Sequence, residues 1–164
     1  MKKIVLLLSL GAILTTCLTG CGSKLPDGMP PLHPLTLTVT QEGKPFPEAS
    51  VSLYPSDGAR GWNSGGLTDA NGVLPVFTHG KYSGVPAGKY KITVDCVTSD
   101  PPRPKNATES EIAEHLKKHP EFRIVPLPFT DRAKTPLEIE VVKGTNRLTI
   151  DIPEKVKLSM GGPP

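Results

Sequence analysis

The stretch Leu35-Thr36-Leu37-Thr38-Val39-Thr40 decides the fold class of this chain. Apolar and hydroxyl-bearing side chains alternate along it, which is the period of a β-strand with one buried face. Four more stretches alternate in the same way or nearly so. Another is a short strand in which Pro75 indicates a sheet edge, and one more short stretch brings the expected number of strands to seven. These stretches are residues 49–53, 90–95, 137–141 and 148–152, then 73–77, and finally 122–125.

Turn residues separate these strands. The tetrapeptides Gln41-Glu42-Gly43-Lys44, Asp69-Ala70-Asn71-Gly72 and Lys143-Gly144-Thr145-Asn146 each place Gly, Asn or Asp where the backbone turns. Many short strands joined by such turns are typical of an all-β sandwich or barrel. We therefore predict one seven-stranded, Greek-key-like β-sandwich over residues 35–153.

Residues 97–128 interrupt the alternation and form a predicted insertion over one end or edge of the sandwich. Pro101-Pro102-Arg103-Pro104 cannot pair in a sheet. A short helix is expected after it, capped by Thr108 or Ser110 and ending at Lys118, because Pro120 cannot continue it. Residues 154–164 carry no ordering pattern and are predicted to be a disordered tail.

The first 20 residues have the pattern of an export signal rather than of a domain. Lys2 and Lys3 precede an apolar run, and a small residue, Gly20, stands directly before Cys21. The run is too short to span a ~30 Å hydrocarbon core comfortably. Cleavage there would leave 144 residues, enough for one domain, and would lower the net charge from +3 to +1. A nearly neutral chain gives no reason to expect a nucleic-acid partner.

Leu18-Thr19-Gly20-Cys21 resembles the bacterial lipobox. The resemblance implies that Cys21 is acylated and anchors the chain to a membrane. A plain cleaved signal and an uncleaved anchor remain the alternatives. Gly22, in place of an Asp, favours the outer membrane within the cell envelope. Residues 21–34 would then be a lipidated cysteine and a Pro/Gly-rich tether that could hold the domain roughly 40 Å from the bilayer if extended.

Three segments resemble carboxypeptidase-regulatory-like, or transthyretin-like (prealbumin-like), domains. They are Gly43-Lys44-Pro45-Phe46-Pro47-Glu48-Ala49, Thr68-Asp69-Ala70-Asn71-Gly72, and Pro86-Ala87-Gly88-Lys89-Tyr90. The ending Thr135-Pro136-Leu137-Glu138-Ile139-Glu140-Val141 resembles small lipoproteins of this kind in planctomycete-type bacteria. The family implies a β-sandwich used as an accessory or adhesive module and implies no reaction.

No catalytic constellation is found in the sequence, and no cofactor is expected. Hydroxyisourate hydrolases, which are transthyretin-like, end in Tyr-Arg-Gly-Ser, whereas this chain ends in Gly161-Gly162-Pro163-Pro164; the His-x-His of intradiol dioxygenases is also missing. His115 and His119, four apart on the expected helix, could share a metal, but they lack the Glu of zinc peptidases and a third ligand. We expect no metal there. Cys96 falls on the apolar face of its strand and is expected to be buried and inert.

Trp62 is the strongest binding candidate, because its glycine-rich loop, residues 58–66, is poorly suited to bury it. Such a ring can stack on a sugar or anchor a protein, or it can fold back over the sandwich. Arg60 and Tyr82 would join it if their loops lie at the same end. We therefore expect a non-enzymatic envelope lipoprotein that binds a polysaccharide or protein partner. The alternatives are a purely structural spacer and a metal-dependent enzyme using His115 and His119.

Overall fold

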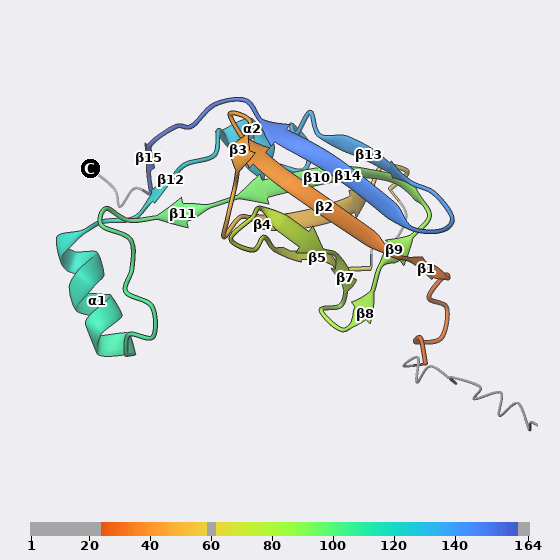
Figure 1. Ribbon diagram of the computed structural model, residues 1–164, viewed down its shortest axis with the longest axis horizontal. Coiled ribbons are helices and arrows are strands. Elements are labelled where there is room, and N and C mark those ends of the chain that lie inside the picture. The colour runs from red at the N-terminus through yellow and green to blue at the C-terminus, as the bar shows by residue number, and fades with distance from the viewer. Residues whose placement is uncertain (1–23, 59–61, 161–164) are drawn as a thin grey trace, which may run out of the picture.

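The computed structural model describes residues 24–58 and 62–160, and it is an all-β sandwich (Figure 1). One layer, the long sheet, has the strand order β13-β10-β4-β5-β7-β8. Its strands are β13 (Glu138–Val141), β10 (Gly88–Asp95), β4 (Ser50–Pro55), β5 (Ser64–Leu67), β7 (Phe77–Thr78) and β8 (Tyr82–Ser83). All of its pairings are antiparallel.

The other layer, the short sheet, is centred on β2 (Leu35–Gln41). The strand β14 (Asn146–Ile152) pairs with one edge of β2, while β3 (Lys44–Pro45) and β6 (Val73–Pro75) pair with the other. The pairing of β2 with β14 is parallel, with Leu35 opposite Asn146 and Gln41 opposite Ile152. β6 pairs only with β2, so Pro75 lies on an edge strand, as its missing N–H requires.

The core lies between the two sheets and is built by the alternating side chains. On β2 every second residue is buried, and Leu37 and Val39 have no exposed surface. Ile92 and Val94 of β10 and Val51 of β4 meet them from the long sheet in the same apolar cluster. At about 1.5–3 kcal/mol for each fully buried aliphatic side chain, this cluster is the main source of stability. The fold class expected from the alternation is confirmed.

One of the seven predicted strands does not belong to the sandwich. Residues 122–125 do contribute β12 (Phe122–Arg123), but this strand pairs with β11 (Val97–Thr98) and β15 (Leu158–Ser159) in a separate small sheet. The long sheet instead contains β5, in the segment predicted to be a loop, which pairs with β4 on one side and with β7 on the other. A Cβ at Gly65, whose φ is +154°, would lie 2.1 Å from the carbonyl oxygen of Val51. Only glycine fits there, so the strand carries no alternation.

The insertion extends beyond one end of the sandwich rather than covering it. The small sheet and α1 (Glu109–Lys118), together called the arm, stand off at the end opposite β1 and β8 (Figure 1). Thr108 caps the helix, with Glu111 completing a capping box, and the helix ends before Pro120. No residue of α1 is fully buried. A second short helix, α2 (Leu127–Thr130), places Phe129 against the core.

Parts of both predicted terminal segments are structured. The end of the expected tether forms β1 (Leu32–His33), which pairs with β9 (Val85–Pro86), and Met29 is buried. β15 falls within the expected tail. Cys21 and the export signal lie outside the described residues. Among the described residues, no helix is long and apolar enough to cross a membrane.

Candidate ligand groove at Trp62

A groove of about 200 Å³ opens at the end of the sandwich where β1 and β9 pair. Its walls come from three stretches that are far apart in the sequence but adjacent in the fold. Register brings them together, since Tyr90 lies opposite Pro55, and Leu32 lies opposite Pro86. The lining residues are Pro30, Pro55, Asp57, Trp62, Pro86, Ala87, Gly88, Lys89 and Tyr90.

Trp62 is half-buried, and its ring lines the groove. The His79 ring meets it edge to face, with the ring centroids 5.6 Å apart and the planes at 89°. Its backbone is held as well: the Ser64 hydroxyl donates to the Trp62 carbonyl at 2.9 Å, and the His79 N–H donates to the neighbouring Asn63 carbonyl at 2.6 Å. The indole is therefore supported from one side while part of it stays accessible.

Tyr90 forms the buried part of the groove wall. Its hydroxyl donates to the Pro86 carbonyl oxygen at 2.8 Å, so its own hydrogen-bonding proton is committed within the protein. Burial raises the pKa of the Tyr90 phenol, and the nearby Asp57 carboxylate raises it further. The wall is thus a neutral aromatic at physiological pH. Lys89, which is exposed, and Asp57 supply the charged groups at the groove.

The structure places the three predicted binding residues differently. Trp62 is in the groove, but Arg60 lies outside the described residues. Tyr82 lies on β8, where its ring sits 5.2 Å below the Lys81 ammonium, and it does not line the groove. From the sequence, Pro86 and Tyr90 are only part of a segment that resembles the domain family, and they are not predicted as binding residues. Their second role depends on the pairing of β10 with β4, which no local motif encodes.

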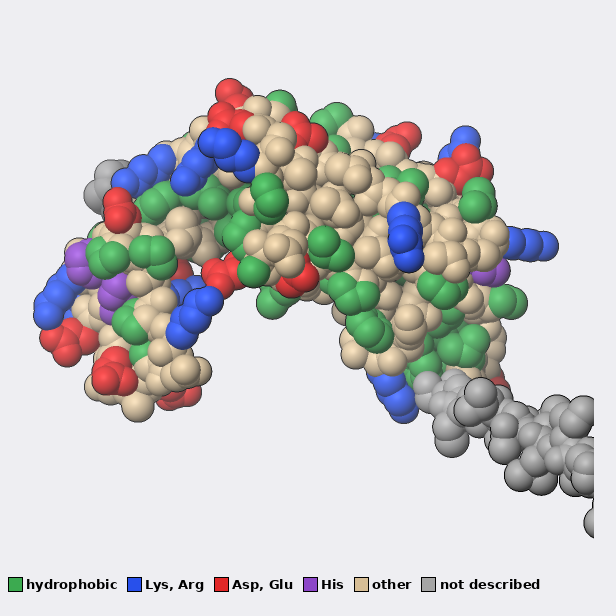
Figure 2. Space-filling model, in the orientation of Figure 1, with side chains coloured by type: hydrophobic (Ala, Val, Ile, Leu, Met, Phe, Trp, Pro, Cys, Tyr) green, Lys and Arg blue, Asp and Glu red, His purple; other side chains and the backbone are tan. Residues whose placement is uncertain are grey.

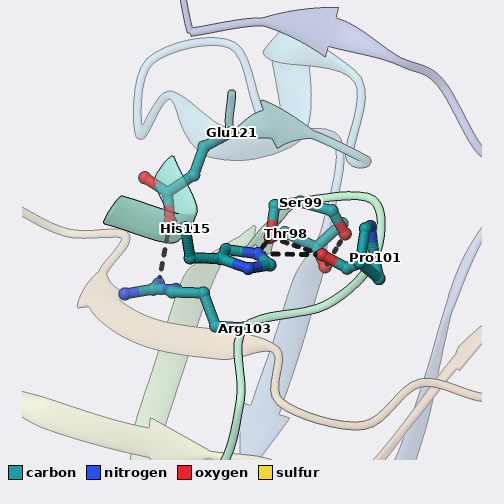
Figure 3. Close-up of polar contacts among 6 residues, drawn as sticks. All are labelled: Thr98, Ser99, Pro101, Arg103, His115 and Glu121. Carbon is teal, nitrogen blue, oxygen red and sulfur yellow. Dashed lines mark hydrogen bonds and ion pairs between the residues drawn. The ribbon is translucent and has the colours of Figure 1, made fainter. Parts of the chain in front are cut away.

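The predicted histidine pair does come together in the arm, with His115 on α1 and His119 directly after its last residue. The rings of His115 and His119 are 4.8 Å apart. The Nε2 atom of His115 lies 3.1 Å from the Pro101 carbonyl oxygen and 3.0 Å from the Ser99 hydroxyl (Figure 3). A carbonyl oxygen only accepts, so this nitrogen carries a proton and donates.

This arrangement is a structural clasp rather than a nucleophile with its base. The hydroxyl of Ser99 donates to Pro101 at 2.9 Å, so its proton points away from His115, and Ser99 is 2% exposed. The clasp joins α1 to the end of β11, and Arg103 pairs with Glu121 at 2.9 Å beside it (Figure 3). Within residues 24–58 and 62–160, no three His, Cys, Asp or Glu side chains are grouped to hold a metal.

Comparison with known proteins gives distant likenesses only. No family model matches the chain, and no curated protein matches it. Two solved structures are similar. The major pilin subunit of Bacillus cereus is 18% identical with a TM-score of 0.43, over 76% of this chain and 31% of the pilin chain. A 5-hydroxyisourate hydrolase of Klebsiella pneumoniae is 15% identical with a TM-score of 0.36, over 79% of this chain and 94% of the hydrolase.

These likenesses carry no statement about activity. The chain spans less than a third of the pilin subunit that it matches, and the hydrolase activity is a property of the Klebsiella protein. The function of the present chain has to be argued from its own residues.

Cys96 behaves as the sequence suggests. It is the free cysteine among the described residues and is buried. Burial raises the pKa of its thiol to about 11, and the Asp95 and Glu48 carboxylates contribute to the rise. Since the thiolate is the reactive form, this side chain is inert near neutral pH.

Proposed function

We propose that this chain is a non-enzymatic cell-envelope lipoprotein, anchored through acylated Cys21, whose transthyretin-like sandwich binds an envelope polysaccharide or protein in the Trp62 groove. The observation that carries the proposal is the groove itself: a supported, half-buried indole faces three prolines and a buried tyrosine at one end of a rigid fold. The lipobox-like Leu18-Thr19-Gly20-Cys21 supports the anchor.

The chemistry of the groove suits stacking more than catalysis. Proline rings and the Trp62 indole offer flat apolar surfaces that pack on the face of a sugar or on another ring. Lys89 and Asp57 can orient a polar ligand through charged hydrogen bonds. The groove is smaller than the ~300–1,000 Å³ of pockets for drug-sized ligands. It therefore suits one ring of a longer polymer or one side chain of a protein.

The binding test uses Trp62 as its own reporter, because it is the only tryptophan in the chain. Envelope polysaccharides and solubilised envelope proteins are titrated against the mature chain while Trp62 emission is followed. Saturable change supports the proposal, and an affinity loss of at least tenfold in Trp62→Ala, read by calorimetry, assigns the site. Tyr82→Ala, on the neighbouring strand β8 but outside the groove, is the matched control and should bind as the parent does.

Three results would contradict parts of the proposal. Mass spectrometry of the protein from its native membrane that finds an unmodified Cys21 would remove the anchor. Unchanged affinity in Trp62→Ala would show that the ligand binds outside the groove, and a lack of saturable binding to any titrated polysaccharide or protein would favour a structural spacer. A metal-dependent enzyme using His115 and His119 would instead require stoichiometric metal that is lost in His115→Ala.

A further inference from the structure

We propose that the lipid anchor holds the Trp62 end of the sandwich against the headgroup layer of the bilayer, so that the lipid surface is the first partner of the Trp62 groove. The inference rests on the anchor in the proposed function and deepens it. A polysaccharide or protein would then reach the groove only by displacing headgroups.

The first argument is the length of the free chain. The N–H of Met29 donates to the Pro26 carbonyl at 3.1 Å, closing a turn in which Gly28 has a φ of +80°. Met29 is buried, and Leu25 is already half-buried. From Cys21 to Leu25 the chain can reach at most about 14 Å, at ~3.6 Å per residue. The roughly 40 Å spacer expected for a fully extended tether is therefore not attained.

The second argument is where this segment joins the fold. Pro30, one residue after Met29, lines the same groove as Trp62. β1 follows directly and pairs with β9, whose Pro86 also lines the groove. The anchor segment and the groove thus share one end of the molecule, and a short link keeps that end at a high effective concentration near the membrane. Weak contacts between the Trp62 end and the headgroups are then enough to hold this end at the membrane.

The third argument is the chemistry of this end. An indole combines an apolar ring with a polar N–H, so it favours the boundary between lipid and water, where tryptophan is enriched. Exposed Lys24 and groove-lining Lys89 can contact anionic headgroups, and Lys81 directly precedes β8, which contacts β1. Apolar side chains gather over this end in the space-filling view (Figure 2). The carboxylates of Asp27 and Asp57 keep the end from being uniformly basic.

The arm lies at the other end of the long axis (Figures 1 and 2). With the Trp62 end on the bilayer, α1 and the small sheet point away from the membrane. The proposal therefore fixes an orientation as well as a contact, and an orientation can be measured with two reporters.

The test couples the mature chain through Cys21 to a maleimide lipid in vesicles of phosphatidylcholine with one-fifth phosphatidylglycerol. Coupling at neutral pH selects Cys21, since the Cys96 thiol is buried and protonated. A tenth of the lipids carry a nitroxide on the headgroup, which quenches nearby indoles. We expect Trp62 emission to fall at least twofold relative to nitroxide-free vesicles. The control is Trp62→Phe combined with Ala113→Trp, which moves the tryptophan to an exposed site on α1 and should lose less than a tenth of its emission.

Three outcomes decide the matter. Strong quenching at position 62 and little at 113 supports the proposal. Equal quenching at both positions overturns it, because the domain then has no preferred orientation. No quenching at position 62 also overturns it. Chemical coupling replaces native acylation, so an unmodified Cys21 in the native protein would contradict the proposed function without changing this measurement. The vesicle result, in turn, does not change the outcome of the ligand titration.

Discussion

Replacing Gly65 by alanine tests whether β5 depends on the close approach of two backbones. The new Cβ would stand 2.1 Å from the Val51 carbonyl oxygen, whereas real Cβ contacts stay above 3.0 Å. β4 and β5 must therefore move apart by about 0.9 Å, which takes ladder hydrogen bonds near the site past 3.5 Å. A φ of +154° adds further strain for any residue with a side chain.

The magnitude follows from these two terms. The disfavoured backbone region costs about 1–3 kcal/mol. Two broken ladder bonds with a buried carbonyl left unpaired cost about 2–3 kcal/mol more. We expect Gly65→Ala to lower the free energy of unfolding by about 3–6 kcal/mol, a large part of the ~5–15 kcal/mol typical of a domain. With a urea m-value of about 2 kcal/mol/M, the midpoint should fall by roughly 2 M.

The assay is urea unfolding followed by Trp62 fluorescence and by far-ultraviolet circular dichroism. Gly80→Ala is the matched control, because Gly80 has a φ of +65° and nothing within 4 Å of its would-be Cβ. Gly80→Ala introduces backbone strain but no steric overlap, so it should lower the free energy of unfolding by only about 1–2 kcal/mol. If the two variants proved equally stable, the close approach of β4 and β5 would not be the reason that residue 65 is glycine.

Three further results are expected. The Thr108 backbone and hydroxyl hold the pKa of the Glu111 carboxylate below its usual range, so the cap of α1 is complete above the unfolded pKa and is lost as pH falls through the folded one. The protection of the α1 amides from exchange, taken relative to the intrinsic exchange rate at each pH, should therefore fall in acid, and it should depend much less on pH in Glu111→Gln. The Cys96 thiol should not react with disulfide reagents at pH 8 until urea unfolds the chain, and labelling of the folded protein at the rate of the unfolded chain would contradict this. Burial of the neutral thiol should also add to the free energy of unfolding, and this contribution should be lost as the pH rises from 9 to about 11. Arg123 donates two hydrogen bonds to Asp95, at 2.6 and 3.0 Å. Arg123→Met should therefore lower the free energy of unfolding by about 1 kcal/mol after allowance for solvent screening. A loss below about 0.3 kcal/mol in thermal unfolding would show that the ion pair does not contribute to stability.

Period-two alternation predicted the strands well because burial of one face leaves a direct trace in the sequence. It identified β2, β4, β10, β13 and β14, and Pro75 correctly marked an edge. The alternation could not reveal β5, where steric fit to Val51 demands glycine and erases any pattern. It also placed residues 122–125 in the sandwich, since a short apolar strand reads the same in any sheet.

The groove was only half predictable. Trp62 drew attention because a large aromatic in a glycine-rich segment needs an explanation. The other residues of the groove could not be identified in this way. Pro55, Pro86 and Tyr90 are brought together by strand register, and the residues before β1 pack beside them. The turn ending at Met29 was equally hidden: Pro and Gly are typical of a flexible tether and of a tight turn alike.

The parallel ladder between β2 and β14 joins residues 111 positions apart. The strand that opens the sandwich, β2, thus receives the neighbour that pairs along its full length only after almost the whole chain has been made. Loop closure over such a span is slow, and partial chains cannot complete the hydrophobic layer. For the export that we propose, in which the chain would cross a membrane channel in an extended state, late closure of this kind would keep the chain unfolded until its last strand has crossed.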